Sequence, residues 1–499
     1  MTEAEGAPGK LRAGGLALPS PDPVVKDPGV FDPARPSPEQ ELQMTVADGF
    51  SLCAVGDCII TRPLSDHLGD EGFRRVVEVF RDGDARFGNC ETTIGDVASR
   101  GGYPMVWDYD WPLLGVPEVA ADLAALGFQL MARANNHALD WNLSGMRETS
   151  RLLDAAGIVH AGVGERLGEA RAARYLETPK GRVGLVSFVS SYLPVSEALA
   201  EQGASPGRPG VSALKVYPST IVPPDVMRAL ASLKPSAPAP ADGQPPAEAN
   251  GDAAGEPPAE LRRFGLRFVA GERLGNTYDV DELHAAEVLR AIRQGKQYSD
   301  FLIAALHAHQ AEDESVELDE PMLPADFVQP FAHAAIDAGA DAFVTTGNHN
   351  LGPVEVYRGR PIFYGLGNFI WSDLLEPLSA DIRKLRDTRE VLARAFTHPE
   401  RATDADVNLA TTGEWFRHDF TFYSVVTRSV FEGGALREVE LHPVWLRHGE
   451  RLTRSGIPQA APPDQAARIL DFLARASEPY GTRIDVVDGV GHVRAGEPG

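Results

Sequence analysis

The sequence FQLMARANNHALD, at residues 128–140, places a short apolar run directly before the polar triplet Asn135-Asn136-His137. An apolar run of this length between helical patterns is typical of a buried strand. Open α/β sheets bind ligands outside the carboxyl ends of their strands, which is where Asn136 and His137 would lie. This stretch therefore predicts a layered α/β fold with a ligand site where strands end.

The same arrangement recurs along the chain, so that buried runs end at polar residues and helical periodicity separates them. The other predicted strands are 50–55 before Gly56-Asp57, 84–88 before Asn89-Cys90-Glu91, 182–189, 301–306 before His307-Ala308-His309, and 341–345 before Gly347-Asn348-His349. The predicted helices are 119–126, 145–156, 285–292 and 327–338. Residues 420–430 and 436–444 predict antiparallel strands, and residues 466–474 predict a closing helix.

The polar residues at these strand ends form a set of metal-ligand types. They are Asp57, Glu91, Asn136, His307, His309 and His349. Carboxylate, amide and imidazole ligands together suit divalent ions such as Mn²⁺, Fe²⁺, Zn²⁺ or Mg²⁺. One or two such ions lower the pKa of a bound water, which can then attack a substrate. The set predicts a metal-dependent reaction at this edge of the sheet.

Each of these residues has an ordinary structural explanation when it is taken alone. An Asp after Gly is usually turn chemistry, and Asn135-Asn136 is compatible with a plain loop. Cys58 and Cys90 flank two of the candidate ligands and are best explained as buried small apolar residues. Asp140 either orients His137 or caps the helix that begins near Asn142. The metal hypothesis rests on the set, because all its members share one kind of position.

Several motifs in this order resemble those of the CapA family, the capsule and poly-γ-glutamate synthesis proteins. They are Ala54-Val55-Gly56-Asp57, Gly88-Asn89-Cys90-Glu91, Ala134-Asn135-Asn136-His137-Ala138-Leu139-Asp140, Arg208-Pro209-Gly210-Val211, and the closing segment from Glu355 to Phe369. The family is similar to calcineurin-like metallophosphatases. The resemblance implies a four-layered α/β/β/α metallophosphatase-like sandwich with a divalent metal site.

The resemblance also assigns roles to the candidate residues. Asp57, Glu91 and Asn136 match metal-ligand positions, and His307 and His349 match later ligands. His137 matches the catalytic histidine, which would protonate the leaving group.

One departure from the family pattern concerns the last histidines. Related sequences often read Gly-His-Gly-Pro-His where this chain has Thr345-Thr346-Gly347-Asn348-His349, so that Thr346 replaces a histidine. Two explanations stay open. Either His309 substitutes for the missing imidazole, or the site holds a single tightly bound metal ion.

Composition predicts three parts of the chain and argues against some classes of partner. Residues 1–45 predict a poorly ordered Pro-rich arm, residues 46–460 one domain with a flexible insertion at about 235–258, and residues 461–499 a C-terminal helix and tail. The formal net charge of −24 argues against nucleic-acid and membrane-surface partners. No apolar run is long enough to cross a bilayer, no signal peptide is evident, and the three cysteines suit a reduced compartment, so we expect a cytoplasmic protein.

Two functions are compatible with these features. The first is a metal-dependent hydrolase in which an activated water attacks a phosphoester, or an amide or γ-glutamyl bond, in a small-molecule or polymer substrate. The second is a non-catalytic accessory or binding protein of capsule or poly-γ-glutamate synthesis that keeps the fold. An enzyme needs an open metal position and a free acid such as His137, whereas a binding protein needs neither.

Overall fold

The computed structural model describes residues 40–105, 112–233, 257–311, 323–372, 386–415 and 419–494. Most of the predicted Pro-rich segment at residues 1–45 and most of the predicted insertion at about 235–258 lie outside these ranges.

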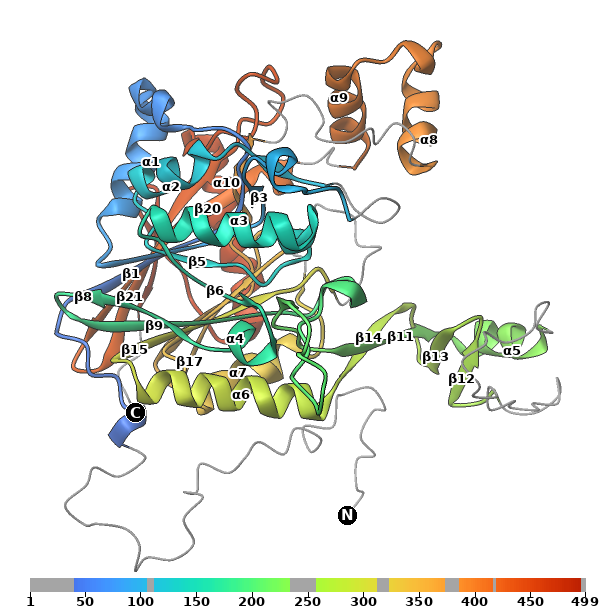
Figure 1. The fold of residues 1–499 in the computed structure, drawn as a ribbon, viewed down its shortest axis with the longest axis horizontal. Coiled ribbons are helices and arrows are strands. Elements are labelled where there is room, and N and C mark those ends of the chain that lie inside the picture. Colours follow the sequence, from blue (N-terminus) through green and yellow to red (C-terminus); the bar gives the residue numbers. More distant parts are fainter. Residues whose placement is uncertain are drawn as a thin grey trace, which may run out of the picture.

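Two large sheets packed face to face form the centre of the molecule (Figure 1). The first sheet has the order β23-β24-β21-β20-β1-β2-β5-β6, with β19 beside β1 and β22 beside β21. Its strands are β1 (Phe50–Ile59), β2 (Ala85–Cys90), β5 (Leu130–Ala132), β6 (Val159–Ala161), β19 (Asn368–Trp371), β20 (Tyr423–Glu432), β21 (Ala435–Trp445), β22 (Gln459–Ala460), β23 (Asp485–Val487) and β24 (Val490–Arg494).

The second sheet has six strands in the order β17-β18-β16-β15-β9-β8, and its centre is parallel. Its strands are β8 (Arg174–Thr178), β9 (Gly181–Val189), β15 (Phe301–His307), β16 (Ala342–Thr346), β17 (Val354–Tyr357) and β18 (Arg360–Phe363). The described ranges also contain two short ladders, β3 (Thr93–Ile94) with β4 (Leu114–Gly115) and β7 (Val163–Gly164) with β10 (Gly210–Val211).

Apolar side chains point alternately to the two faces of the strands, which explains why helices cover both outer faces of the sheets. In β15, Phe301 and Ile303 belong to the core between the sheets, whereas Leu302 and Ala304 belong to the core beneath the helices. Helices α1 (Glu71–Arg81), α2 (Glu118–Leu126) and α3 (Asn142–Ala155) cover the first sheet, and α6 (Glu282–Gln297) and α7 (Val328–Asp337) cover the second. The expected four-layered α/β/β/α sandwich is confirmed.

The C-terminal segment contains a β-hairpin in addition to the predicted closing helix. Helix α10 (Pro463–Ser477) packs on the core between the sheets, as a closing helix would. Beyond it, however, β23 and β24 form a hairpin that pairs with β21. Its turn is Asp488-Gly489, where both residues have positive φ (50° and 79°), the backbone that suits a tight hairpin. The part after α10 is therefore an edge of the first sheet rather than a tail.

Two further units stand apart from the sandwich in Figure 1. One, which we call the arm, is the sheet β12-β13-β11-β14 with helix α5. Its elements are β11 (Val216–Val222), α5 (Pro224–Ser232), β12 (Glu260–Arg263), β13 (Leu266–Ala270) and β14 (Gly275–Val280). In the other unit, α8 (Arg386–Ala395) packs against α9 (Asp404–Trp415). The short helix α4 (Leu167–Ala170) belongs to neither unit and lies beside β7. None of the described helices is long and apolar enough to cross a bilayer.

The strand ends differ from expectation at one functional position. The sequence predicts that the first strand ends at Gly56-Asp57, but β1 continues to Ile59. It continues because β19 pairs with this second half, with Asp57 opposite Asn368 and Ile59 opposite Trp371. Asp57 therefore lies within a strand, whereas Glu91 follows β2 directly and His307 is the last residue of β15.

Candidate metal centre

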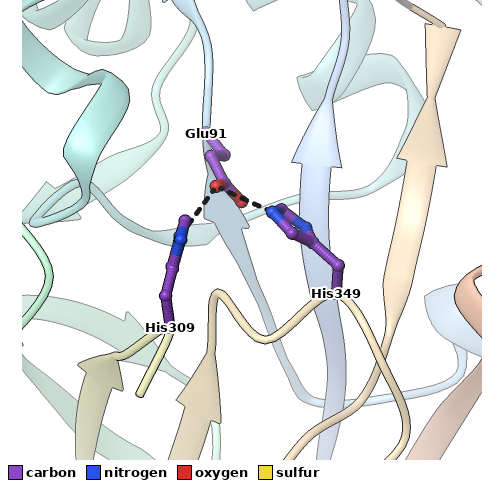
Figure 2. Close-up of side chains that lie close together, drawn as sticks. All are labelled: Glu91, His309 and His349. Atoms are coloured by element: carbon purple, nitrogen blue, oxygen red, sulfur yellow. Dashed lines mark ion pairs between the residues drawn. The ribbon is translucent and has the colours of Figure 1, made fainter. Parts of the chain in front are cut away.

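Glu91 lies at the centre of a cluster that draws on both large sheets. Its carboxylate is fully buried, and its Oε1 lies 3.6 Å from Nε2 of His307, 4.0 Å from Nε2 of His309 and 3.9 Å from Nε2 of His349. Figure 2 shows the imidazoles of His309 and His349 pointing at this carboxylate from two sides. Three imidazoles thus surround one carboxylate oxygen at the carboxyl ends of the strands.

Asp57 completes the cluster on the side of the first sheet. Its Oδ2 accepts a hydrogen bond from the backbone N–H of Gly347 at 3.0 Å and lies 3.7 Å from Nδ1 of His349. The candidate ligands form two groups, and within each group the ligand atoms lie within 4.8 Å of one another. The first group is Asp57, Glu91 and His307, and the second is Glu91, His309 and His349. Glu91 belongs to both groups.

Asn136 reaches the same point from the 3-10 turn Asn136–Leu139, which follows β5. Its Oδ1 lies 2.9 Å from Nε2 of His307, and the Nε2 atoms of His307 and His309 are 3.1 Å apart. All six residues that the sequence singled out as candidate ligands are therefore brought together. Their role as ligands stays a prediction.

Asn89 is a member of the cluster that the sequence analysis did not assign. It is fully buried, and its Nδ2 donates to Oδ1 of Asp57 at 2.8 Å and lies 3.4 Å from Oε2 of Glu91. Its own Oδ1 accepts from Nδ2 of Asn135 at 3.2 Å. Asn89 thus fixes the positions of the two carboxylates relative to each other. The feature of the sequence that could have indicated this role is its place two residues before Glu91 in the Asn-x-Glu motif.

Asn368 orients His349 and was likewise missed. Nδ2 of Asn368 donates to the carbonyl of Thr421 at 3.4 Å, so its Oδ1 faces Nδ1 of His349 at 2.8 Å. An amide oxygen only accepts, so Nδ1 of His349 carries the proton and Nε2 presents a lone pair toward Glu91. A metal-ligating histidine usually has its second nitrogen held in this way. The closing motif that ends at Phe369 contained this asparagine.

The hydroxyl of Thr346 contacts a ligand candidate instead of replacing one. Its Oγ1 lies 3.1 Å from Nδ1 of His307, and Thr346 is itself buried. His309 is the residue that brings a third imidazole to Glu91, from just beyond the end of β15. This geometry favours the explanation in which His309 substitutes for the histidine that is absent at position 346.

His137 and Asp140 form a buried pair next to the cluster. Nδ1 of His137 donates to Oδ2 of Asp140 at 2.8 Å, and the same oxygen accepts from the backbone N–H of Leu113 at 2.7 Å. The N-cap residue of α3 is Trp141 rather than Asp140. The geometry favours the orienting role over the capping role, because it holds Nδ1 of His137 on the buried carboxylate of Asp140.

Electrostatics favour a neutral imidazole at His307. Burial, followed by the nearby imidazoles of His309 and His349, lowers the pKa of His307 well below its usual range. A neutral imidazole is the form that binds a metal ion. Burial also raises the pKa of Cys58 and of Cys90, so both thiols stay protonated. They are buried apolar residues beside the cluster, as the sequence suggested.

The donor set fits a divalent cation. It offers two carboxylates, three imidazoles and one amide oxygen, which are the donors that Mn²⁺, Fe²⁺, Zn²⁺ and Mg²⁺ accept in proteins. Buried carboxylates this close to one another repel unless a cation or a proton offsets their charge. The charge and the donor types of the cluster therefore suit a divalent cation.

Comparison with known proteins agrees with the motifs. A family profile described as bacterial capsule synthesis protein PGA_cap matches residues 51–373. An uncharacterized protein of Sinorhizobium fredii, y4sH, is 42% identical over 459 residues, which cover 90% of this chain and 94% of that protein. A probable polyglutamine synthesis accessory protein of Mycobacterium tuberculosis is 27% identical over 288 residues, 56% of this chain and 54% of its own length.

Similar solved structures include a putative 5'-nucleotidase from Staphylococcus aureus in complex with alpha-ketoglutarate. It is 12% identical, with a TM-score of 0.31, and the match covers 64% of this chain and 49% of the nucleotidase chain.

Proposed function

Because the chain belongs to the family of bacterial capsule synthesis proteins PGA_cap, we propose that it is a metal-dependent hydrolase of this family. Its substrate is a phosphoester or, as the second choice, an amide or γ-glutamyl bond. The observation that carries the proposal is the convergence of His307, His309 and His349 on one buried oxygen of Glu91.

Asp57, Glu91, Asn136, His307, His309 and His349 would hold the metal. A divalent ion supplies Lewis-acid chemistry, since it polarises the bond to be cleaved and lowers the pKa of water. The neutral amide of Asn136 leaves more positive charge on such an ion than a third carboxylate would. Asn89, Asn368 and Thr346 hold the side chains in place, so that little reorganisation is needed when an ion binds.

His137 would act as the acid that protonates the leaving group. Asp140 accepts a hydrogen bond from Nδ1–H of His137 and thereby fixes both the tautomer and the direction of the imidazole ring. The buried carboxylate also stabilises the imidazolium form, which must exist before Nε2 can donate. Positioned acid catalysis of this kind typically contributes about 10²–10⁴ in rate.

The test combines metal analysis with a leaving-group series. Purified protein should contain a divalent metal, and it should hydrolyse phosphoesters or amides in a substrate screen. His137→Ala should retain metal and fold but lose about 10²–10⁴ in turnover on a substrate with a poor leaving group. The loss should be much smaller for a nitrophenyl ester, whose leaving group needs no proton. His398→Ala, which removes an exposed histidine that pairs with Glu400, is the matched control.

The accessory-protein alternative gives different results in the same experiment. The Mycobacterium tuberculosis relative carries the word accessory in its name, which is what favours this second candidate. A non-catalytic protein would hydrolyse none of the screened substrates, although it could still bind metal. Metal loss in His137→Ala, with turnover otherwise present, would instead make His137 a ligand.

A further inference from the structure

A basic cavity lies beside the His137–Asp140 pair, outside the metal cluster. It is a solvent-open hollow of about 840 Å³ between the chain around Ser99 to Met105 and the first turns of α3. Three guanidiniums line it, those of Arg100, Arg147 and Arg151. A concentration of positive charge is notable in a chain whose formal net charge is −24.

The charge of the cavity is only partly neutralised by the protein. The buried carboxylate of Glu148 pairs with Nε of Arg100 at 2.9 Å and with Nη2 of Arg151 at 2.7 Å. One carboxylate thus serves two guanidiniums and fixes both at the wall. Arg147 pairs with Glu165, and both of these side chains are about half exposed. Exposed ion pairs contribute little to stability, so a ligand can compete for Arg147.

The cavity and the proposed acid share a segment of chain. The backbone N–H of Met105, which lines the cavity, donates to the carbonyl of Asp140 at 2.7 Å. Asn142, two residues after Asp140, also lines it, and Ser144 donates from its Oγ to the carbonyl of Arg100 at 2.6 Å. A ligand seated here therefore lies next to the segment that carries His137.

We propose that this cavity binds the anionic groups of an extended substrate, carboxylate or phosphate, while the bond to be cleaved lies at the metal cluster. Guanidiniums are suited to this task because their fixed fork of N–H groups matches the oxygens of either group. The substrate role rests on the proposed function, whereas the binding itself does not. A binding measurement on metal-free protein thus separates the two.

The experiment measures fluorescence anisotropy of labelled probes with chelator present. The probes are a short glutamate oligomer, a polyphosphate, and a glutamine oligomer as the uncharged reference. The full chain should bind one of the two anionic probes and bind the glutamine oligomer at least about tenfold more weakly, with affinity falling as salt screens the charges. The better anionic probe identifies which group the cavity recognises.

Variants that remove a positive charge, and one that removes a negative charge, test the cavity itself. Arg100→Gln and Arg151→Gln should each weaken binding about five- to tenfold, because each removes charge-assisted hydrogen bonds. Glu165→Gln should tighten binding about two- to threefold, because it releases Arg147 from its exposed pair. Arg386→Gln is the matched control, since Arg386 is an exposed arginine paired with Glu390 on α8.

The proposal is overturned if the protein binds the charged and uncharged oligomers equally, or if the control weakens binding as much as Arg100→Gln does. An unchanged affinity in both cavity variants would also overturn it, because binding would then occur elsewhere. Failure of the hydrolase proposal leaves these results unaffected, since no turnover is measured.

Discussion

The side chain of Asn368 makes one hydrogen bond that decides which nitrogen His349 presents to Glu91. Asn368→Leu keeps the size of the side chain but removes the acceptor. We expect divalent metal affinity to fall about tenfold, because outer partners of ligating histidines typically contribute about 10–100-fold. Isothermal titration with Mn²⁺ measures it, and Asn276→Leu in the arm is the control. Unchanged affinity with an intact fold would show that Asn368 does not position the ligand.

His160 carries a residue-scale prediction about pH. Burial, followed by the charge of Arg133, lowers the pKa of His160 to about 4. The unfolded chain, with an ordinary histidine pKa near 6.5, binds the extra proton first as pH falls. Stability contributed by neutral His160 is therefore complete above pH ~6.5 and is lost between pH ~6.5 and ~4, by at most roughly 3 kcal/mol.

Urea unfolding at several pH values tests this prediction. His160→Gln should flatten the decline in the free energy of unfolding over that window, since its side chain does not titrate. His398→Ala should keep the slope of the wild-type protein, because His398 is exposed. A variant His160→Gln with the same slope as wild type would assign the decline to other groups.

Sequence and structure agree best for residues whose role depends on position along a strand. Glu91, His307 and His349 were found because they follow apolar runs, and the strands they follow converge in space. Asn89 and Asn368 were not assigned, because their function is to hold other side chains across the sequence, and no local pattern marks such a contact. Asp57 was found for a partly wrong reason, since β1 continues past it.

At the scale of elements, the arm is joined to the sandwich through a two-stranded base. Ile221 lies opposite Gly275, and nearer the sandwich Tyr278 packs into the core beneath the helices of the second sheet. Beyond that base, α5 and β13 form a small core of their own around Val222, Met227 and Phe268. Few contacts therefore connect the outer part of the arm to the rest of the fold.

Replacing residues 222–274 with an Asn-Gly turn should leave the sandwich intact. The two strand ends already lie at hairpin distance, and Asn-Gly is the preferred two-residue connection. We expect the melting temperature to change by no more than a few degrees, roughly the effect of 1–2 kcal/mol in a chain of this size. Circular dichroism during heating measures it. Loss of the cooperative transition would show that the arm supports the core.

Helices and parallel strands were predictable because their periodicity is local, and α2, α6 and α7 appear within a few residues of the predicted ranges. The hairpin of β23 and β24 was not recognised, although Asp488-Gly489 is a strong turn signal, because its strands are short and partly exposed. The small sheet of the arm was missed for a similar reason, since its strands carry mixed polar and apolar residues.

At the scale of the whole molecule, the metal cluster joins the two large sheets. Asp57 and Glu91 come from the first sheet, whereas His307 ends a strand of the second sheet and His309 and His349 follow strands of that sheet. A bound ion would therefore stabilise the packing of the sheets as well as the site. Saturation at 100 times the dissociation constant contributes about 2.7 kcal/mol, which corresponds to roughly 3 °C in melting temperature.

Thermal unfolding with Mn²⁺ and with chelator checks this expectation. The shift should disappear in Glu91→Gln, because this change removes the charge that both groups of ligands share. It should persist in Glu432→Gln, which alters an exposed carboxylate paired with Arg437. An equal shift in Glu91→Gln would place the stabilising ion elsewhere on the protein.

The position of β1 in the first sheet has a consequence for the synthesis of the chain. β1 lies between β2 and β20, so Ser51 pairs with Val430 and Leu52 with Ser429. At about 5–20 residues per second, the ribosome makes β20 roughly 20–70 s after β1. During that interval one apolar edge of the nascent sheet has no partner strand, and such edges invite pairing with other chains. A molecular chaperone that shields the emerging N-terminal half would be most useful in this interval, and translation stalled before residue 423 would yield aggregation-prone fragments.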